Sequence, residues 1–491
     1  MPATNVLSLE GSKNANKKAP RIRVIYSLHS EVQNQPDWPN TGFDFRPYIV
    51  NFNRKLTSAF RDVEFIPVLA TGPEDAGKIV SQDANESIDD YIVFQMNCWN
   101  RVIQTVAETK KPVLYVDFKY GGSGGFLVYT ASMLRGSFPN VGFVSSSGTD
   151  DLIRSAGCLV EVIRKKTPSE MSQLVQKVRT RLTPQPGKYK LADDKVDFLQ
   201  IDECIRRMKN SKILAVRDQN RSSAQPVFGI PVEYIPFSEI NEAWSSASRT
   251  EAEQIADKWV KNARSVIDVP LETLISSAAM YLGMKSVLKS HGANAITINC
   301  LGGFYGGHIH AYPCLGFYEL NNEGLVGGCE CDIRSCATMV AFSILSGGRP
   351  GFISDPVIDT SKRQIVYAHC VAPNKVFGSN GPENPYVIMT HSEDRNGASV
   401  RSILPVNYMV TTLQIHNDRK EILIHRAVAN DNDSDDRACR TKLCAEPLGD
   451  IEKLFTMWDT WGWHRVTFYG DLKDAVNALA GEMGWKVIEE A

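Results

Sequence analysis

Hydrophobic residues in the first third of the chain fall into short runs that are separated by helix-length amphipathic segments. The runs are rich in β-branched and aromatic residues and lie at 21–26, 63–68, 90–95 and 112–117. Alternation of this kind is typical of βαβ units and a parallel sheet. We therefore predict a flexible N-terminal tail over residues 1–20 and a Rossmann-like α/β domain over residues 21–183.

A second α/β pattern follows the turn-forming segment Pro184–Gly187, which is typical of a linker. Apolar runs expected to be strands lie at 212–216, 232–235 and 295–299, and long helical patterns lie at 250–265 and 271–291. We predict a central α/β domain over residues 184–350.

The pattern changes beyond Ser361, where short alternating runs lie between Asn, Gly and Pro turns. These runs are at 364–368, 386–390, 409–414 and 421–425, and a helical pattern follows near 472–483. Short alternating runs are typical of antiparallel strands with one buried face. We predict a β-rich domain, an antiparallel sheet or barrel, over residues 351–491. The expected fold class is thus α/β, with two Rossmann-like α/β domains followed by a β-rich C-terminal domain.

The composition excludes several classes of protein. Of the 491 residues, 43% are hydrophobic and 22% are charged, which argues against a disordered, collagen-like or coiled-coil chain. The formal charge is −2, so we expect neither nucleic acid nor an anionic membrane as a partner. No run approaches the roughly 20 apolar residues of a membrane span, and the polar N-terminus lacks the apolar core of a signal peptide. We expect a cytoplasmic protein, although a chain whose signal peptide had been removed would have the same pattern.

The cysteines make a poor disulfide framework. Their number, eleven, is odd, and Cys329, Cys331 and Cys336 crowd into one segment. A chain of this length does not need disulfides for a stable core, so we expect reduced thiols.

Acidic residues beside these cysteines form the densest chemical pattern. Glu330 lies among glycine and cysteine neighbours, where a carboxylate needs a partner, commonly a cation or a metal. Asp332 precedes a long apolar helical pattern, and we expect it to cap that helix. Asp355 follows a strand-like run over 350–354, and His369 ends the next run. Two acids and a histidine at the ends of successive elements suit Mn²⁺, Mg²⁺ or Fe²⁺. The alternative is that Glu330 is a solvated loop acid.

A further histidine, His464, follows Trp461 and Trp463 near the C-terminus. Tryptophan faces beside a polar ligand are the usual lining of a sugar pocket, although a lone histidine is more often structural. His308 and His310 alternate as on a strand, and both a structural and a functional interpretation of that pair stay open.

Two other motifs favour structural interpretations. The glycine cluster Gly121–Gly125 follows the fourth apolar run, but it lacks the lysine of a P-loop, so we expect a tight turn rather than a phosphate site. The basic residues at 437–440, with Lys442, fit either an anion site or a solvated surface, and we expect the latter.

The order of these motifs resembles the superfamily of L-fucose and L-arabinose isomerases, which have two α/β domains followed by a β-rich one. The resemblance covers about residues 295–471. It is carried by Glu330-Cys331-Asp332 before a helix, Asp355 after Phe352–Ser354, and the segment His464–Gly470. In L-fucose isomerases the matching acid, aspartate and final histidine bind Mn²⁺. The resemblance therefore implies Glu330, Asp355 and His464 as metal ligands, and it places His369 near a metal histidine of arabinose isomerases.

The resemblance implies an isomerase that interconverts an aldose and a ketose through a cis-enediolate. Glu330 and Asp355 would act as acid and base, and Mn²⁺, Mg²⁺ or another divalent cation would be the cofactor. The residues expected to bind the sugar are Trp461, Trp463, His369, His310 and Asp332. Two alternatives stay open: a metal-dependent enzyme that cleaves, eliminates or epimerises a sugar or glycoside, and a non-catalytic sugar-binding protein. A homo-oligomer, a trimer or hexamer, is also implied.

Overall fold

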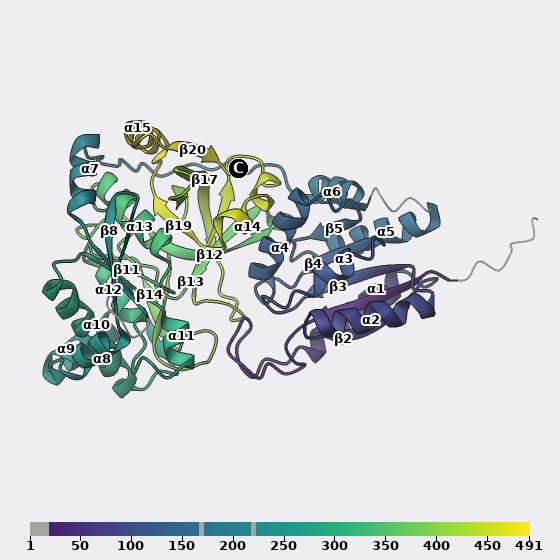
Figure 1. Ribbon diagram of the computed structural model, residues 1–491, viewed down its shortest axis with the longest axis horizontal. Helices are drawn as coiled ribbons and strands as arrows, with labels where there is room; N and C mark the ends of the chain where they lie inside the picture. The colour runs from purple at the N-terminus through teal and green to yellow at the C-terminus, as the bar shows by residue number, and fades with distance from the viewer. Residues whose placement is uncertain (1–18, 166–170, 218–221) are drawn as a thin grey trace, which may run out of the picture.

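The computed structural model of the protein describes residues 19–165, 171–217 and 222–491, so most of the expected N-terminal tail lies outside the described residues. The first domain (Figure 1, purple to blue) is a parallel sheet of order β2-β1-β3-β4-β5 with helices on both faces. Every residue of β3 and β4 is buried, which explains their continuous apolar runs. The strands are β1 (Arg21–Ser27), β2 (Glu64–Ala70), β3 (Asp90–Gln95), β4 (Val113–Asp117) and β5 (Val141–Val144). The helices are α1 (Arg46–Ala59), α2 (Pro73–Glu86), α3 (Val102–Ala107), α4 (Ser123–Arg135), α5 (Thr149–Lys165) and α6 (Met171–Leu182).

The glycine cluster forms the tight turn that the sequence predicts, between β4 and α4. A Cβ on Gly122 would lie 1.9 Å from the backbone oxygen of Gln95, so only glycine fits there. A Cβ on Gly124 would lie 2.7 Å from the ring of Trp463. The turn therefore brings the first domain into close contact with the C-terminal segment that carries His464.

The central domain (Figure 1, teal) contains a second sheet, of order β11-β10-β6-β8-β7. All pairings are parallel except the edge strand β7, and neither β7 nor β11 is evident in the sequence pattern. The strands are β6 (Ile213–Val216), β7 (Ser222–Val227), β8 (Ile230–Ile235), β10 (Ala295–Ile298) and β11 (Val326–Gly328). The helices are α7 (Ile201–Asn210), α8 (Phe237–Ser245), α9 (Arg249–Asn262), α10 (Leu271–Ser290), α11 (Cys300–Tyr305), α12 (Cys314–Asn322) and α13 (Ile333–Leu345).

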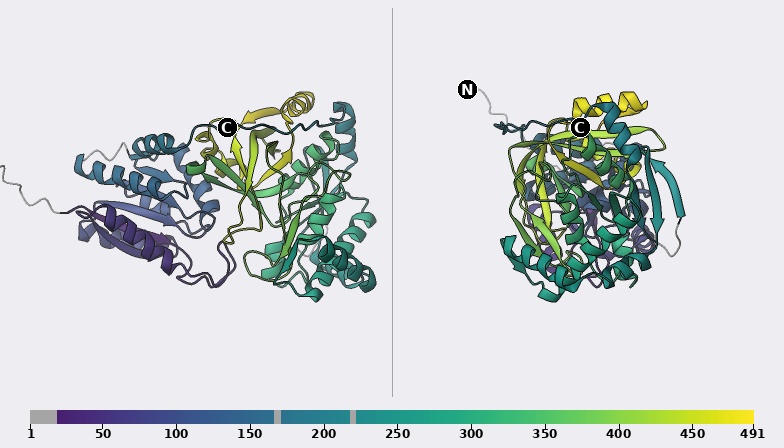
Figure 2. Two further views of the ribbon diagram at one scale, coloured as in Figure 1. Left: turned by 180° about the vertical axis from the view of Figure 1, so that it is seen from behind. Right: turned by 90° about the vertical axis from the view of Figure 1, so that its left-hand side faces the viewer.

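The C-terminal domain is a closed antiparallel barrel that lies between the other two domains in Figure 1 and in the left view of Figure 2. The order β16-β19-β12-β13-β18-β17 closes because β16 also pairs with β17, and β20 (Lys486–Glu489) runs parallel to β17. Closure leaves no free edge in this ring. Its strands are β12 (Phe352–Asp359), β13 (Gln364–His369), β16 (Tyr408–His416), β17 (Glu421–Asn432), β18 (Thr441–Pro447) and β19 (Arg465–Tyr469), with helices α14 (Trp458–Trp461) and α15 (Lys473–Met483).

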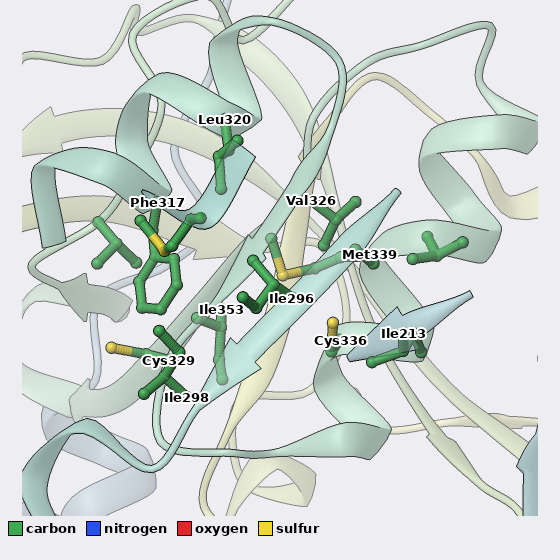
Figure 3. Packing of buried hydrophobic residues seen from close by; sticks show 14 of the residues in the cluster. Ile213, Ile296, Ile298, Phe317, Leu320, Val326, Cys329, Cys336, Met339 and Ile353 are labelled. Carbon is green, nitrogen blue, oxygen red and sulfur yellow. The ribbon is translucent and has the colours of Figure 1, made fainter. Parts of the chain in front are cut away.

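A small three-stranded sheet joins the central and C-terminal regions. β9 (Ser265–Ile267) pairs in parallel with β14 (Tyr386–Met389), which pairs antiparallel with β15 (Ser399–Ser402). The core is continuous across the same junction. Ile296 and Ile298 of the central sheet, Met339 of α13 and Ile353 of β12 belong to one buried cluster (Figure 3). The rim of the barrel is thus held firmly against the central sheet.

Three local expectations are wrong. His308 and His310 do not lie on a strand, because Gly307 adopts a φ of 69° and the chain turns after α11. Asp355 does not end a strand but lies in the middle of β12. Lys442 is not solvated: it is 1% exposed, in β18.

None of the eleven cysteines, all of which lie in the described part of the chain, forms a disulfide, and ten of them are buried, as expected for reduced thiols that pack as small apolar side chains. Among the described residues, no helix is both long and apolar enough to cross a membrane.

Candidate metal centre

Four side chains converge where the barrel rim meets the carboxyl end of the central sheet. One donor atom from each of Glu330, Asp355, His369 and His464 lies within 4.8 Å of the others. His464 Nε2 is 3.3 Å from Glu330 Oε2 and 3.1 Å from Asp355 Oδ1. His369 Nε2 is 3.8 Å from both Glu330 Oε1 and Asp355 Oδ2. Carboxylate and imidazole donors at this spacing surround a volume that suits a divalent cation.

Strand register explains why three of these donors meet. β12 lies between β19 and β13. Ser354, which precedes Asp355, pairs with Arg465, which follows His464. Asp355 itself pairs with Ala368, the residue before His369. Neighbouring strands of an antiparallel sheet lie about 4.8 Å apart, so the three side chains are held at metal-binding distance by the backbone of the barrel.

Glu330 reaches the cluster from the central domain through an unusual backbone. Glu330 and Cys331 have φ angles of 59° and 52°, in the left-handed region that costs a non-glycine residue about 1–2 kcal/mol. The N–H of Cys331 donates to the carbonyl of Ile298 at 2.9 Å, which fixes this turn against β10. Strain of this kind is concentrated at functional sites, and here it directs the Glu330 carboxylate toward the barrel rim.

Asp332 connects the helix to the cluster. Its Oδ1 accepts from the N–H of Ser335 at 3.0 Å, so it caps α13 as the sequence predicts. Its Oδ2 lies 2.9 Å from Nδ1 of His464. A proton on Nδ1 that is shared with Asp332 leaves Nε2 facing Glu330 and Asp355. This is the arrangement that orients a histidine ligand of a metal.

Burial and neighbouring charges shift the pKa values of the cluster in opposite directions. Burial lowers the pKa of His464. The charge of Glu330 and the hydrogen bonds of His464 with Asp332 and Asp355 outweigh burial and raise that pKa well above the ordinary value. Burial raises the pKa of Glu330, but the charge and hydrogen bond of His464 hold it below its ordinary value. For Asp355, burial dominates and raises the pKa. The two carboxyl groups are thus driven in opposite directions.

Two atoms of the cluster lack a hydrogen-bond partner. Among the described residues, neither Asp355 Oδ1 nor His369 Nε2 has a partner of acceptable geometry, although both are buried. Buried polar atoms without a partner are rare and destabilising unless a ligand satisfies them. The donor set therefore fits a bound metal ion.

A cavity of about 650 Å³ opens over the cluster. Glu330, Asp332, Asp355 and His464 form its floor. Indole rings cover one side: Trp463 makes edge contacts with Trp38 at 5.3 Å and with Trp99 at 5.9 Å between ring centroids. The volume and the combination of aromatic and polar lining match a small-molecule site.

The predicted site residues do not all line this cavity. Trp463 and Asp332 line it, and His369 lies in the donor cluster. Trp461 is buried instead, with its ring 5.4 Å from that of His416. His310 is exposed beside Trp244, at 5.8 Å between ring centroids, and does not line the cavity.

Several lining residues have no signal in the sequence analysis, notably His29, Asp37, Trp38, Trp99, Tyr305 and Glu393. Trp99 follows the carboxyl end of β3, where ligands of parallel sheets commonly bind, so its position could have been used. Glu393 lies in the loop between β14 and β15. It accepts from the Tyr305 hydroxyl at 2.8 Å, and burial raises its pKa to about 8.

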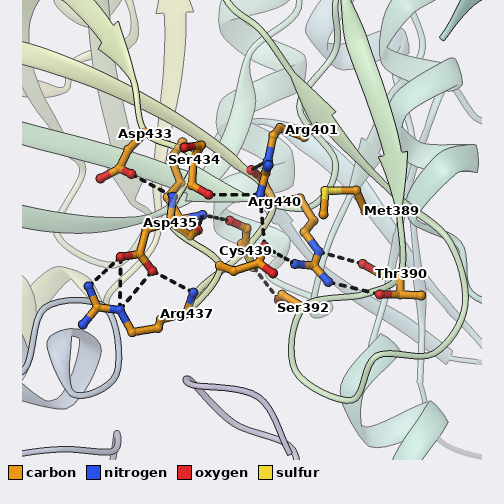
Figure 4. A network of polar contacts seen from close by, with 12 residues as sticks. Met389, Thr390, Ser392, Arg401, Asp433, Ser434, Asp435, Arg437, Cys439 and Arg440 are labelled. Carbon is orange, nitrogen blue, oxygen red and sulfur yellow. Dashed lines mark hydrogen bonds and ion pairs between the residues drawn. The ribbon is translucent and has the colours of Figure 1, made fainter. Parts of the chain in front are cut away.

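Buried arginine contacts hold that loop in place. Arg440 is 0% exposed and donates to the carbonyl of Thr390 at 2.7 Å and to its hydroxyl at 3.1 Å (Figure 4). Arg437 binds Asp435 in the same segment. The expectation that this basic segment is solvated is therefore wrong for Arg440, because a buried guanidinium is stabilised by carbonyl and carboxylate acceptors.

A second buried ionic cluster lies inside the barrel. Arg465 donates to Glu490 at 2.7 Å, and the other Glu490 oxygen lies 2.8 Å from Nδ1 of His425. His425 Nε2 lies 2.7 Å from the Tyr367 hydroxyl. Arg465 also donates to the carbonyl of His464 at 2.9 Å. This cluster anchors the C-terminus of the chain beside the candidate metal centre.

Comparisons with known proteins find similarity to sugar isomerases. Residues 203–348 match the family model of the L-arabinose isomerase central domain. A sulfoquinovose isomerase of Clostridium sp. (strain MSTE9) is 24% identical over 306 residues, which are 58% of this chain and 65% of that protein. An L-arabinose isomerase of Vibrio parahaemolyticus serotype O3:K6 (strain RIMD 2210633) is 28% identical over 169 residues, 33% of each chain. The chain thus spans less than two thirds of the length of these relatives.

The matched region includes Glu330 and Asp332, but Asp355, His369 and His464 lie outside the family model. A solved structure, the XylFII molecule, aligns over 59% of this chain and 85% of its own, at 11% identity and a TM-score of 0.17, which is too low to carry an argument.

Proposed function

We propose that this chain, a divergent member of the superfamily of L-arabinose and L-fucose isomerases, is a metal-dependent enzyme that interconverts an aldose and a ketose. The observation that carries the proposal is the convergence of Glu330, Asp355, His369 and His464, in which two buried donor atoms have no hydrogen-bond partner of acceptable geometry among the described residues. These four residues are the proposed metal ligands. A divalent cation held there would polarise the sugar carbonyl and stabilise the enediolate.

The carboxyl groups supply the proton transfers. Isomerisation removes a proton from the carbon beside the carbonyl and returns it to the neighbouring carbon. Glu330, whose pKa is held below its ordinary value, takes and returns the carbon-bound proton. Asp355, whose pKa is raised by burial, carries the proton that moves between the two sugar oxygens. His369 and His464 orient these carboxylates.

The first domain contributes recognition. Trp99 from that domain and Trp463, which packs against the buried Trp38, offer indole surfaces on which the C–H face of a sugar ring can pack. Trp99 remains 49% exposed, so this wall is accessible from the cavity mouth. Glu393 and Tyr305 add polar groups to the cavity lining that suit sugar hydroxyls.

The geometry favours isomerisation over glycoside cleavage. Donor oxygens of Glu330 and Asp355 lie within 4.8 Å of one another. Retaining glycosidases separate their two carboxyl groups by about 5–5.5 Å and inverting ones by about 6.5–9.5 Å. A pair this close, shared with two histidines, suits a common metal better than the two faces of a glycosidic bond.

Turnover with and without metal tests the proposal. Protein stripped with EDTA and reloaded with Mn²⁺ is offered free aldoses, including L-arabinose, L-fucose and sulfoquinovose, in ²H₂O. We expect a ketose, with deuterium at the carbon that exchanges its proton. Glu330→Gln should abolish both signals, whereas Glu74→Gln, an exposed acid on α2, should change neither.

Two outcomes would contradict the proposal. A Glu330→Gln protein that isomerises at the wild-type rate would contradict the catalytic assignment. Sugar binding without exchange or ketose formation by metal-loaded wild type would instead support a non-catalytic sugar-binding protein.

A further inference from the structure

Arg334 lines the cavity without a partner. It is the second residue of α13, partly buried, and it shares the cavity wall with Glu330 and Asp355. Among the described residues, no acceptor lies within hydrogen-bond distance of its guanidinium, and no carboxylate oxygen lies within the 4.0 Å of an ion pair. Arg349 and Arg465, in contrast, each bind a carboxylate at 2.7 Å. A partly desolvated guanidinium of this kind calls for an anion.

The position of Arg334 on the helix strengthens this need. α13 has 13 residues, and Arg334 lies in its first turn, where the helix dipole disfavours a positive charge. The capping carboxylate of Asp332 does not compensate for it, because its two oxygens are already bound to Ser335 and His464. The guanidinium and the amino end of the helix therefore form a positive region in a cavity whose floor is otherwise acidic.

The turn at Gly462 lies close to this guanidinium. Gly462, in the turn between Trp461 and Trp463, has a φ of 76°, and a Cβ there would lie 3.0 Å from Nη2 of Arg334. The turn that carries the aromatic wall and His464 thus passes close to Arg334 without blocking it. Among the described residues, Arg334 forms no ion pair with the donor carboxylates, so its guanidinium stays available to a ligand in the same cavity.

We propose that Arg334 binds an anionic group, a phosphate, sulfonate or carboxylate, at the end of the sugar remote from its carbonyl. The inference rests on the proposed function, which places the carbonyl end at Glu330 and Asp355. A cavity of about 650 Å³ holds a hexose together with such a group. Planar guanidinium donors match the oxygens of these anions, and charge-assisted hydrogen bonds of this type are strong. Arg334 is therefore the residue that selects acidic sugars over neutral ones.

Binding of compounds that cannot be isomerised tests this subsite independently of catalysis. D-glucitol, its 6-phosphate, its 6-sulfonate and L-gulonate, the matching carboxylate, all lack a reactive carbonyl. Isothermal titration of each into Mn²⁺-loaded protein compares wild type with Arg334→Gln. Arg334→Lys serves as the conservative variant, and Arg54→Gln, which removes an exposed arginine from α1, serves as the charge control.

We expect at least one anionic compound to bind wild type roughly ten- to a hundred-fold more tightly than glucitol. Arg334→Gln should remove that preference and leave glucitol affinity and Mn²⁺ affinity unchanged, while Arg334→Lys should keep part of it and Arg54→Gln all of it. The three anionic arms identify which group is preferred.

Equal affinity of wild type for neutral and anionic compounds, or no binding of any anionic compound at millimolar concentration, would overturn the proposal. So would an equal loss of neutral and anionic binding in Arg334→Gln. Anion binding that depends on Arg334 in a protein that isomerises no aldose would keep the subsite and reject the isomerase.

Discussion

Two buried clusters of acids and histidines lie side by side in this molecule, and they differ in one respect. In the cluster inside the barrel, Tyr367, His425, Arg465 and Glu490 are each at most 1% exposed, and each of these four described side chains is paired. In the candidate metal centre, Asp355 Oδ1 and His369 Nε2 have no hydrogen-bond partner of acceptable geometry among the described residues. The first cluster completes its own hydrogen bonding, and the second needs a ligand to do so.

The difference teaches how to tell a structural ionic network from a functional one. Composition does not separate them, because each contains a carboxylate and a histidine. They are separated by solvent access and by hydrogen bonding. Residues of the candidate metal centre line a cavity, whereas the side chains of the barrel cluster are buried. Arg465 links the two, since its guanidinium binds Glu490 and also the carbonyl of His464.

The largest expected effect comes from Asp355→Asn. Activity should fall by about 10²–10⁴-fold, because a ligand and a proton carrier are lost together. Stability of the metal-free protein should not fall, since a carboxylate whose pKa is raised by burial is destabilising when it is ionised. Urea unfolding of EDTA-treated protein checks this. A large loss of stability in the metal-free protein would show that Asp355 has a structural role instead.

Glu490→Gln should lower the stability of the protein, in contrast to Asp355→Asn. Removing one partner of a buried ion pair leaves Arg465 uncompensated and should destabilise the protein by about 3–5 kcal/mol, with or without metal. Glu489→Gln provides the matched control, because Glu489 is half-exposed and binds Lys473 at the surface. Urea unfolding of both variants is the measurement. If the two variants were equally stable, the result would contradict a structural role for the barrel cluster.

The pH dependence of unfolding sharpens the same contrast. Burial raises the pKa of Glu490, but the charge of Arg465 and the hydrogen bond with His425 outweigh it and lower that pKa to about 2. A carboxyl with a depressed folded pKa stabilises the protein above its unfolded pKa of about 4.3, and that stability is lost as the pH falls toward 2.

The contribution at pH 7 is about 3 kcal/mol. The difference in unfolding free energy between wild type and Glu490→Gln should therefore shrink as the pH falls from about 5 to 2. Urea unfolding at several pH values in that window measures it, and a constant difference would contradict the assignment.

The smallest effect is expected from Asp332→Asn. The amide still caps α13, but His464 loses its charged partner and Mn²⁺ affinity should fall by about 10–100-fold. Asp37→Asn is the control, because Asp37 lines the same cavity but binds His29 instead of a proposed ligand. Equal Mn²⁺ affinity of the two variants would show that Asp332 does not orient His464.

Much of the architecture could be predicted from periodicity. Strands β3, β4 and β10 and helices α9, α10 and α15 follow the expected ranges closely, because each has a strong local pattern. The short strands β7 and β11 and the long extension of β17 to Asn432 could not be predicted, because pairing partners rather than local sequence determine them.

The candidate site shows the same division. Glu330 could be selected as an acid among cysteines and His464 as a histidine beside tryptophans. Asp355 and His369 could be selected because each comes at the end of a strand-like run, and the family resemblance implies their part in the site. The cavity residues from the first domain, Trp38 and Trp99, could not be placed, because local sequence patterns do not determine how domains pack against one another. His310 has the right chemistry for the site, but the turn at Gly307 leaves it beside Trp244.

The central claim is that Glu330, Asp355, His369 and His464 bind one divalent cation. Titration of EDTA-stripped wild-type protein with Mn²⁺, with free Mn²⁺ followed by electron paramagnetic resonance, tests it most directly. The account predicts one bound Mn²⁺ per chain, lost in Glu330→Gln and retained in Glu489→Gln. Absence of Mn²⁺ binding to wild type at millimolar concentration, or unchanged binding in Glu330→Gln, would contradict it.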